Sequence, residues 1–394
     1  MTSAAIATGR VRLRAKAADP RSAAFALAFA GVAVVGCLDG GYYERSWAWI
    51  GLALAAAAGL RLSLGDEYPD RRGFVVLAAL AGLASWTLLS AFWGIAGTEA
   101  VREAGRCAVY LAGFSAFVVV ARPSNARALL AGVLCAGTFL AGLALAEKLV
   151  SPPPPDPFQG TLLYGPVGYA NALGIIAAVG LVLAIGLLVE TGTQRARAAL
   201  VVAAFTCGTA LALTSSRGAW LATLAGLLVL AGLRASKRGL LGLGLAVTLA
   251  CVAIAPFAAP SVSMGDRPAY WKAAAAEASA HPFVGSGAGS FDDFWLDHRT
   301  IGAFVQDAHS LYLETAAELG LVGLALLGCT LLVPLSTAIT RRRQPLVPVA
   351  AAAYLTFLVH AGLDWDWEMP ATTLAGLACA AALIGNARKP LTRN

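Results

Sequence analysis

Long apolar runs separated by short polar segments follow one another along almost the whole chain. Twelve runs are distinguishable, near residues 22–38, 47–61, 74–92, 107–121, 128–146, 167–189, 198–214, 218–233, 240–259, 315–338, 347–363 and 370–385. A helix needs about 20 apolar residues to cross a bilayer, and the runs approach that length although several are short. The pattern predicts an all-α polytopic membrane protein with about twelve transmembrane helices, and residues 1–394 are expected to form a single integral membrane domain.

The composition agrees with this prediction. Of the 394 residues, 58% are hydrophobic and only 13% are charged, too few to cover the surface of a soluble protein of this length. The net charge of +7 would suggest a nucleic-acid partner in a soluble protein. In a membrane protein, basic residues belong mainly to cytoplasmic loops, so membrane lipids are expected around this chain and nucleic acid is not.

The distribution of charge predicts the orientation of the spans. With the N-terminus in the cytoplasm and the sides alternating, 21 of the 29 basic residues fall in cytoplasmic segments and 17 of the 22 acidic residues fall outside. The basic residues left outside are Arg45, Arg102, Arg106, Lys148, Arg217, Arg267, Lys272 and Arg299. We therefore expect a multi-pass protein of the bacterial cytoplasmic (inner) membrane with both termini in the cytoplasm.

One connection is much longer than the others. Residues 260–314 form a large extracytoplasmic loop between the predicted spans 9 and 10, and its many aromatic residues indicate that it is folded. Pro268 and the alanine-rich run after it predict a short helix that ends at His281-Pro282. The glycine-rich stretch 285–289 predicts a turn, and it lacks the preceding strand and following Lys-Ser/Thr of a nucleotide-binding loop.

Two arginines outside the membrane are candidate anion ligands. Arg217 follows Ser216, a plausible N-cap, at the start of a span, and a cation at a helix N-terminus is unfavourable unless an anion is also bound there. Together with free backbone N–H groups it would bind phosphate or carboxylate, whereas the alternative is snorkelling to lipid headgroups. Arg267 lies just before the loop helix, where Asp266 or a headgroup is the alternative partner.

His309 is the candidate general base. If Asp307 caps the tenth span, His309 lies in the first helical turn, where the helix dipole lowers the pKa of an imidazole and keeps it neutral. Glu314 and Glu318 follow on one face of the same helix, where they line a pathway or serve the structure.

Several segments resemble, in their order and spacing, the O-antigen ligase and O-antigen polymerase superfamily of bacterial membrane glycan ligases. The resemblance is strongest over about 160–330, and the segments are Tyr169-Ala170-Asn171, Ser216-Arg217-Gly218-Ala219-Trp220, Arg267-x-x-x-Trp271, His281-Pro282-Phe283-Val284-Gly285-Ser286-Gly287, Ala308-His309-Ser310-Leu311-Tyr312-Leu313-Glu314 and Glu318-Leu319-Gly320-Leu321-Val322-Gly323. Many relatives have Asn after the histidine, where this chain has Ser310.

The resemblance implies a membrane glycosyltransferase that moves a glycan from an undecaprenyl diphosphate carrier to the hydroxyl of a glycan, glycolipid or protein acceptor, without metal or nucleotide cofactor. By resemblance, Arg217 and Arg267 bind the diphosphate and His309 deprotonates the acceptor. Supporting roles fall to Asp307, Tyr312, Glu314 and Asn171.

Two alternatives remain at this stage. A polymerase would use the same donor chemistry with a different acceptor, and a transporter or flippase would belong to another class. Against a transporter, the chain has neither inverted repeats nor charges at the middle of its spans. The acidic turn Asp364-Trp365-Asp366-Trp367-Glu368 has no assigned role, because two interfacial Trp residues account for its aromatics and carboxylates alone indicate a metal only weakly.

Overall fold

The computed structural model describes residues 19–64, 68–234 and 265–386. Within these ranges the chain forms thirteen α-helices and three short 3₁₀ helices, with no β-strand. The helices that match apolar runs are α1 (Pro20–Gly36), α2 (Glu44–Leu64), α3 (Arg71–Leu89), α4 (Gly97–Val120), α5 (Ala126–Val150), α6 (Ala170–Val189), α7 (Gln194–Thr214), α8 (Arg217–Arg234), α12 (Leu311–Arg341), α13 (Leu346–Ala361) and α14 (Pro370–Asn386). The remaining two, α10 (Arg267–Ala280) and α11 (Phe291–His298), precede α12.

Eight of the described helices are long and apolar enough to cross a bilayer, and α1, α13 and α14 are shorter apolar helices. An all-helical polytopic membrane protein is therefore the architecture that the structure supports. Eleven of the twelve predicted runs coincide with a helix, whereas the run 240–259 lies outside the described residues. The count of twelve spans stays a prediction.

The core of the bundle is built around α14. Every residue of α14 is buried, and α1, α4, α5, α6, α12 and α13 pack around it. Small residues let the helices approach closely where lipid provides no hydrophobic drive between them. At Gly132 of α5, for example, an added Cβ would lie 2.5 Å from the carbonyl oxygen of Phe25 in α1.

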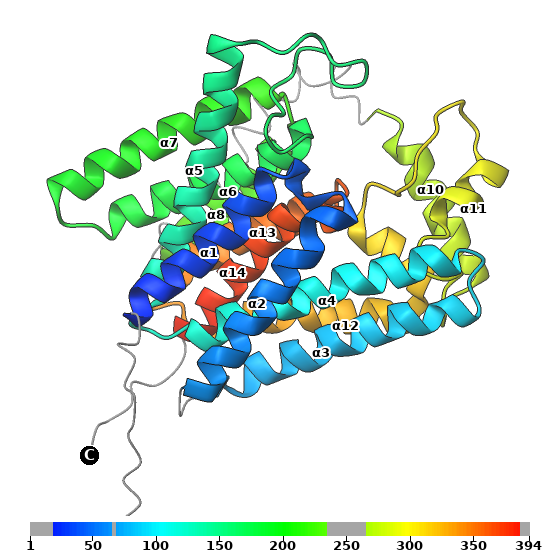
Figure 1. Ribbon diagram of the computed structural model, residues 1–394, viewed down its shortest axis with the longest axis horizontal. Coiled ribbons are helices and arrows are strands. Elements are labelled where there is room, and N and C mark those ends of the chain that lie inside the picture. The colour runs from blue at the N-terminus through cyan, green and yellow to red at the C-terminus, as the bar shows by residue number, and fades with distance from the viewer. Residues whose placement is uncertain (1–18, 65–67, 235–264, 387–394) are drawn as a thin grey trace, which may run out of the picture.

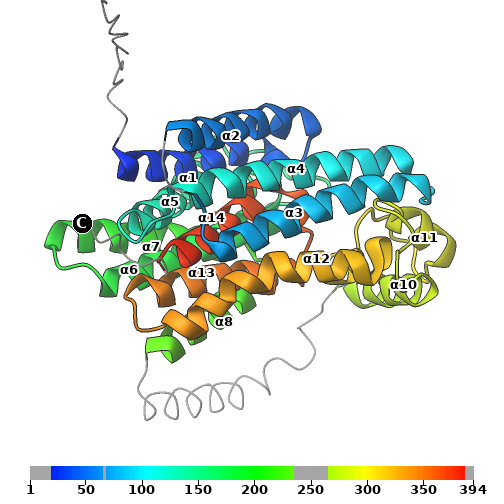
Figure 2. The ribbon, with the colours of Figure 1, turned by 90° about the horizontal axis from the view of Figure 1, so that it is seen from below.

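The helices α10 and α11 lie together at one end of the bundle, on the right in Figures 1 and 2. We call this the site end. Connections from distant parts of the sequence meet here, because the Tyr42 hydroxyl donates to Gln306 and Ala288 N–H donates to the Ser90 hydroxyl. Arg267 at the start of α10 contacts the turn between α13 and α14.

Basic residues cluster at the opposite end. Arg127 donates to the Glu190 carbonyl, Arg234 forms an ion pair with the Glu190 carboxylate at 2.6 Å, and Arg72 donates to Thr340. These arginines lie in segments that the sequence assigns to the cytoplasm. The basic connections and the site end therefore lie at opposite ends of the bundle.

A kink in α12 receives the glycine-rich turn after α10. Gly320 has φ 63° and ψ −163°, a conformation that essentially only glycine adopts. Leu321 N–H donates to the Pro282 carbonyl and Gly287 N–H donates to the Glu318 carbonyl, so the turn pairs with the kinked backbone. The turn predicted from sequence is therefore fixed against α12, and it holds α10 over the N-terminal part of that helix.

Candidate active site at one end of the bundle

Arg267 and Asp364 form the centre of a polar group at the site end. Arg267 Nη2 lies 2.7 Å from Asp364 Oδ2, and the Asp364 side chain is only 3% exposed. Asn171 Nδ2 donates to the same carboxylate at 2.6 Å, and the Tyr169 hydroxyl donates to it at 3.1 Å. Asp364 thus takes the place of Asp266, the neighbour expected as the alternative partner of Arg267. Asn171, predicted as a supporting residue, belongs to this group.

The predicted helical position of His309 is wrong. The helix α12 begins at Leu311 with Ser310 at its N-cap position, and His309 precedes it in a left-handed conformation with φ 53°. Asp307 does not cap the helix, because the left-handed turn at His309 moves the start of the helix to Ser310. The Asp307 carboxylate instead lies beside those of Glu314 and Glu368.

His309 is held in a defined orientation and protonation state. Its Nδ1 lies 3.1 Å from the Asp307 carbonyl oxygen, and a carbonyl only accepts, so Nδ1 carries the hydrogen and Nε2 is the basic nitrogen. The ring lies 5.4 Å from that of Tyr270 in α10. Burial lowers the pKa of His309 below its usual 6.5, against the opposite effect of the Asp364 charge. The predicted direction of the pKa shift is therefore confirmed, but its cause is desolvation.

Trp365 joins the parts of the site. Its ring lies 4.7 Å from that of Tyr169, 5.5 Å from that of Tyr42 and 6.1 Å from that of His309. Trp367, two residues later, is 6% exposed and packs against Tyr110. The sequence predicts two interfacial Trp residues, whereas the structure packs Trp365 against the rings of the site and Trp367 in the core.

Arg217 begins α8 at the same end of the bundle. The Ser216 hydroxyl accepts from Ala219 N–H at 3.3 Å, which confirms Ser216 as the N-cap. The Arg217 side chain is exposed. The start of α8 packs between α6 and α13, because a Cβ on Gly174 would lie 2.9 Å from the Ser216 Cβ and one on Gly218 would lie 3.3 Å from His360 Nε2.

His360, near the end of α13, is a buried histidine with only one of its two ring nitrogens hydrogen-bonded among the described residues. Its Nδ1 lies 2.7 Å from Asp366 Oδ2 and the residue is fully buried. Its Nε2 has no hydrogen-bond partner among the described residues. Tyr312, predicted as a supporting residue, donates its hydroxyl to the Leu358 carbonyl at 2.6 Å, which joins α12 to α13.

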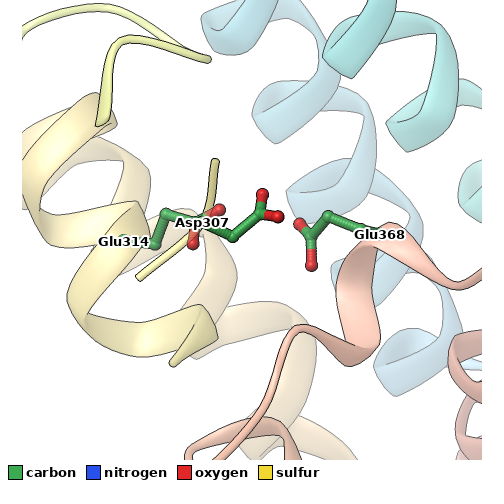
Figure 3. Close-up of side chains that lie close together, drawn as sticks. All are labelled: Asp307, Glu314 and Glu368. Carbon is green, nitrogen blue, oxygen red and sulfur yellow. The ribbon is translucent and has the colours of Figure 1, made fainter. Parts of the chain in front are cut away.

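An acidic cavity of about 280 Å³ lies next to this group. We define the acidic cavity by its lining residues, Tyr42, Tyr43, Glu44, Glu99, Arg102, Glu103, Arg106, Gly289, Asp292, Gln306, Asp307, Glu314, Glu318 and Glu368. Asp307, Glu314 and Glu368 converge in it from the loop before α12, from α12 and from the turn before α14 (Figure 3). Their carboxylate oxygens lie within 4.8 Å of one another, so these three residues could hold a metal ion. Burial raises the pKa of Asp307 to about 7.

Sequence reasoning missed Asp364, Trp365, Tyr42 and Arg106 as parts of the site. The one available signal was the concentration of three carboxylates in the short turn between two apolar runs. Carboxylates that become buried need polar partners, so three of them between two apolar runs indicate a turn that contacts other polar groups of the fold. Its partners Arg267 and Tyr42 lie 97 and 323 residues away along the chain, and no local pattern connects them.

Comparison with known protein families identifies the central segment of the chain. The family model described as O-antigen ligase matches residues 200–328, about a third of the sequence. This match confirms the resemblance to the O-antigen ligase and polymerase superfamily, and the matched segment contains Arg217, Arg267 and His309. No curated protein matches the sequence significantly.

The match and the fold together describe a helical membrane protein whose residues 200–328 are similar to O-antigen ligases.

Proposed function

We propose that this protein transfers a glycan from an undecaprenyl diphosphate-linked donor to an acceptor hydroxyl at the outer face of the bacterial cytoplasmic membrane. The observation that carries the proposal is the grouping of His309, Arg267, Asp364 and Asn171, which come from four separate segments, at one end of an apolar helix bundle. A general base and a cation in one partly buried site suit a reaction that deprotonates a hydroxyl and releases an anion.

Arg267 and Arg217 would bind the donor diphosphate. Arg267 is 26% exposed, and Asp364 and Asn171 hold its surroundings in place. Its Nε has no hydrogen-bond partner among the described residues, so the guanidinium still has donors for an anionic ligand. Arg217 lies exposed at the capped N-terminus of α8, whose backbone N–H groups favour an anion. The guanidinium groups would stabilise the negative charge that grows on the leaving diphosphate.

His309 would act as the general base through Nε2. The acceptor hydroxyl oxygen forms a bond to the anomeric carbon, and its proton moves to Nε2. The bond between the anomeric carbon and the diphosphate oxygen breaks, and its electron pair leaves with undecaprenyl diphosphate. The donor, the acceptor and the histidine then account for every atom and charge of the step. The protein residues provide binding, charge stabilisation and proton transfer.

The orientation follows from the charge distribution. Arg72, Arg127 and Arg234 lie at the end of the bundle opposite the site, and cytoplasmic segments carry the excess of basic residues. The site end is then extracytoplasmic, with α10 and α11 forming the outer loop that the sequence predicts. A carrier lipid would lie along the helices with its diphosphate at the interface.

The test uses purified full-length protein in detergent with an undecaprenyl diphosphate-linked oligosaccharide and a panel of glycan acceptors. Wild type should release undecaprenyl diphosphate, and His309→Ala should lower the rate by about 10²–10⁴-fold, the usual contribution of a general base. Arg217→Ala should raise the KM for donor. The matched control is His298→Ala, because His298 is exposed on α11 and outside this group.

The outcomes separate the alternatives. One transfer per acceptor indicates a ligase, and a ladder of longer products indicates a polymerase. Full activity of both His309→Ala and Arg217→Ala would refute the assigned roles. Movement of intact donor across proteoliposomes without release of undecaprenyl diphosphate would show a transporter instead.

A further inference from the structure

The acidic cavity lies directly beside the candidate base. Gln306 and Asp307 line the cavity, and His309 follows Asp307 by two residues. Tyr42 also lines the cavity, and its ring contacts Trp365, which in turn contacts His309. The Tyr42 and Trp365 rings therefore connect the cavity to His309, and an acceptor bound in the cavity would reach His309 with the part of the molecule that extends past these rings.

The charge of the cavity excludes a second diphosphate. Eight carboxylates line it, against Arg102 and Arg106 as the cations. Arg106 lies 2.6 Å from Glu103 and 3.7 Å from Glu368, so much of its charge is already balanced. Wherever these carboxylates are ionised, a phosphate or carboxylate group placed here would face an excess of like charge, which disfavours its binding. The anionic donor belongs on the Arg267 side.

The hydrogen-bonding groups of the cavity call for a ligand that both donates and accepts. The carboxylates of Asp307 and Glu368 only accept when ionised, and they face each other across the cavity (Figure 3). Arg106 is 2% exposed and lines the same cavity, yet its Nε lacks a hydrogen-bond partner in the described part of the chain. A metal ion would satisfy the carboxylates and leave this N–H without an acceptor. Hydroxyl groups of a sugar satisfy both kinds of group.

The shape of the cavity also suits a sugar. Its deepest residues, Arg106, Glu318 and Glu368, are each less than 9% exposed, whereas Tyr43, Glu44 and Gln306 at the rim are exposed. The cavity therefore opens to the surface at the site end. The Tyr42 and Tyr43 rings, 5.3 Å apart, provide apolar surface at this mouth.

We infer that the acidic cavity binds the acceptor sugar through its hydroxyl groups and selects acceptors that carry no carboxylate or phosphate on that sugar. This inference rests on the proposed transferase function and deepens it. The site is then divided by charge, with the donor diphosphate on the side of Arg267 and a neutral or amine-bearing acceptor sugar on the side of Glu368, and with His309 between them.

The test compares methyl glucoside with two acceptors that each differ from it in one group, the methyl glycosides of glucosamine and of glucuronic acid. Transfer from the lipid-linked donor is measured with the full-length protein. The KM for the glucuronide should exceed that for the glucosaminide by about tenfold or more, because like charges at close range disfavour binding. Glu368→Gln and Asp307→Asn, which keep the shape of each side chain, should each reduce that ratio to about threefold or less. Asp297→Asn, an exposed carboxylate on α11 outside the cavity, should leave the ratio unchanged.

The outcomes distinguish this inference from the proposed function. Release of undecaprenyl diphosphate with equal KM values for the three glycosides, or a ratio that both cavity variants leave intact, would overturn the inference and leave the transferase standing. No release with any acceptor would reject the transferase itself. Binding of Mn²⁺ to wild type at micromolar concentration, followed by electron paramagnetic resonance and lost in both variants, would show a metal site in place of the sugar site.

Discussion

Arg267 and Asp364 meet at 2.7 Å although 97 residues separate them in the sequence. The arginine begins α10, and the aspartate lies in the turn between α13 and α14, next to Asn171 and Tyr169 of the α6 start. This pair joins the extramembrane helices to the bundle at the place where the site is formed. The position of the arginine therefore depends on a residue outside the segment that resembles O-antigen ligases.

The first prediction concerns this dependence. Asp364→Asn and Arg267→Ala should each raise the KM for donor. In free energy, the loss of kcat/KM in the double variant should be smaller than the sum of the two single losses, because both substitutions act on one guanidinium. A coupling free energy of about 0.5–3 kcal/mol is expected for residues in direct contact. A double-mutant cycle on kcat/KM for donor measures it. Strict additivity would mean that Asp364 does not position Arg267.

The pH dependence of the reaction provides a second prediction. Burial lowers the pKa of His309 below 6.5, and a general base works only when neutral, so kcat/KM for acceptor should fall on the acid side with a midpoint below pH 6.5 and be level near pH 7. The Asp364 charge raises this pKa and Arg267 lowers it. Asp364→Asn should therefore move the acid limb to lower pH. A midpoint above pH 6.5, or one that does not move in this variant, would contradict the role of His309.

A third prediction tests the kink of α12. Gly320→Ala forces a side chain into a conformation that costs about 1–3 kcal/mol, and its Cβ would lie 2.4 Å from the Phe283 carbonyl carbon. We expect a lower unfolding temperature and loss of transfer, because the turn that holds α10 is displaced. Gly328→Ala in the same helix has open space around it and should be neutral or slightly stabilising. A thiol-reactive dye that reports exposure of the buried Cys107, Cys207 and Cys379 measures the transition. Equal unfolding temperatures for the two variants would refute this role of Gly320.

The buried pair of His360 and Asp366 leads to a fourth prediction. Removing one partner leaves the other buried alone, which typically costs about 3–5 kcal/mol. His360→Ala should therefore lower the unfolding temperature clearly, and His360→Ala combined with Asp366→Ala should be less destabilised than His360→Ala alone. The same thiol assay provides the measurement. If the double variant is less stable than His360→Ala alone, the pair contributes to folding stability by more than the mutual compensation of two buried polar groups.

The architecture and the first candidate residues of the site could be predicted from the amino-acid sequence alone. Eleven described helices match apolar runs, because the length and polarity of a membrane span are local properties that the bilayer imposes on each segment separately. Ser216 as a helix cap and the end of α10 at His281 were also within reach of local rules. The lowered pKa of His309 was predicted from a helical position that the residue does not occupy, and its cause is burial in the tertiary structure. Arg217, Arg267 and His309 could be selected one by one, since each is a charged or basic group next to an apolar run.

How these residues combine into a site depends on the packing of the helices, which the sequence pattern does not reveal. The left-handed turn at His309 takes Asp307 away from the helix start and into the acidic cavity with Glu368. Asp364 becomes the partner of Arg267, and Trp365 contacts His309, although both looked like parts of an interfacial turn. The physical reason is that a buried charge takes whichever partner packing brings within hydrogen-bond distance. In a helical bundle that partner comes from the end of another helix. It is far away in the sequence, and the pattern of apolar and polar residues does not identify it.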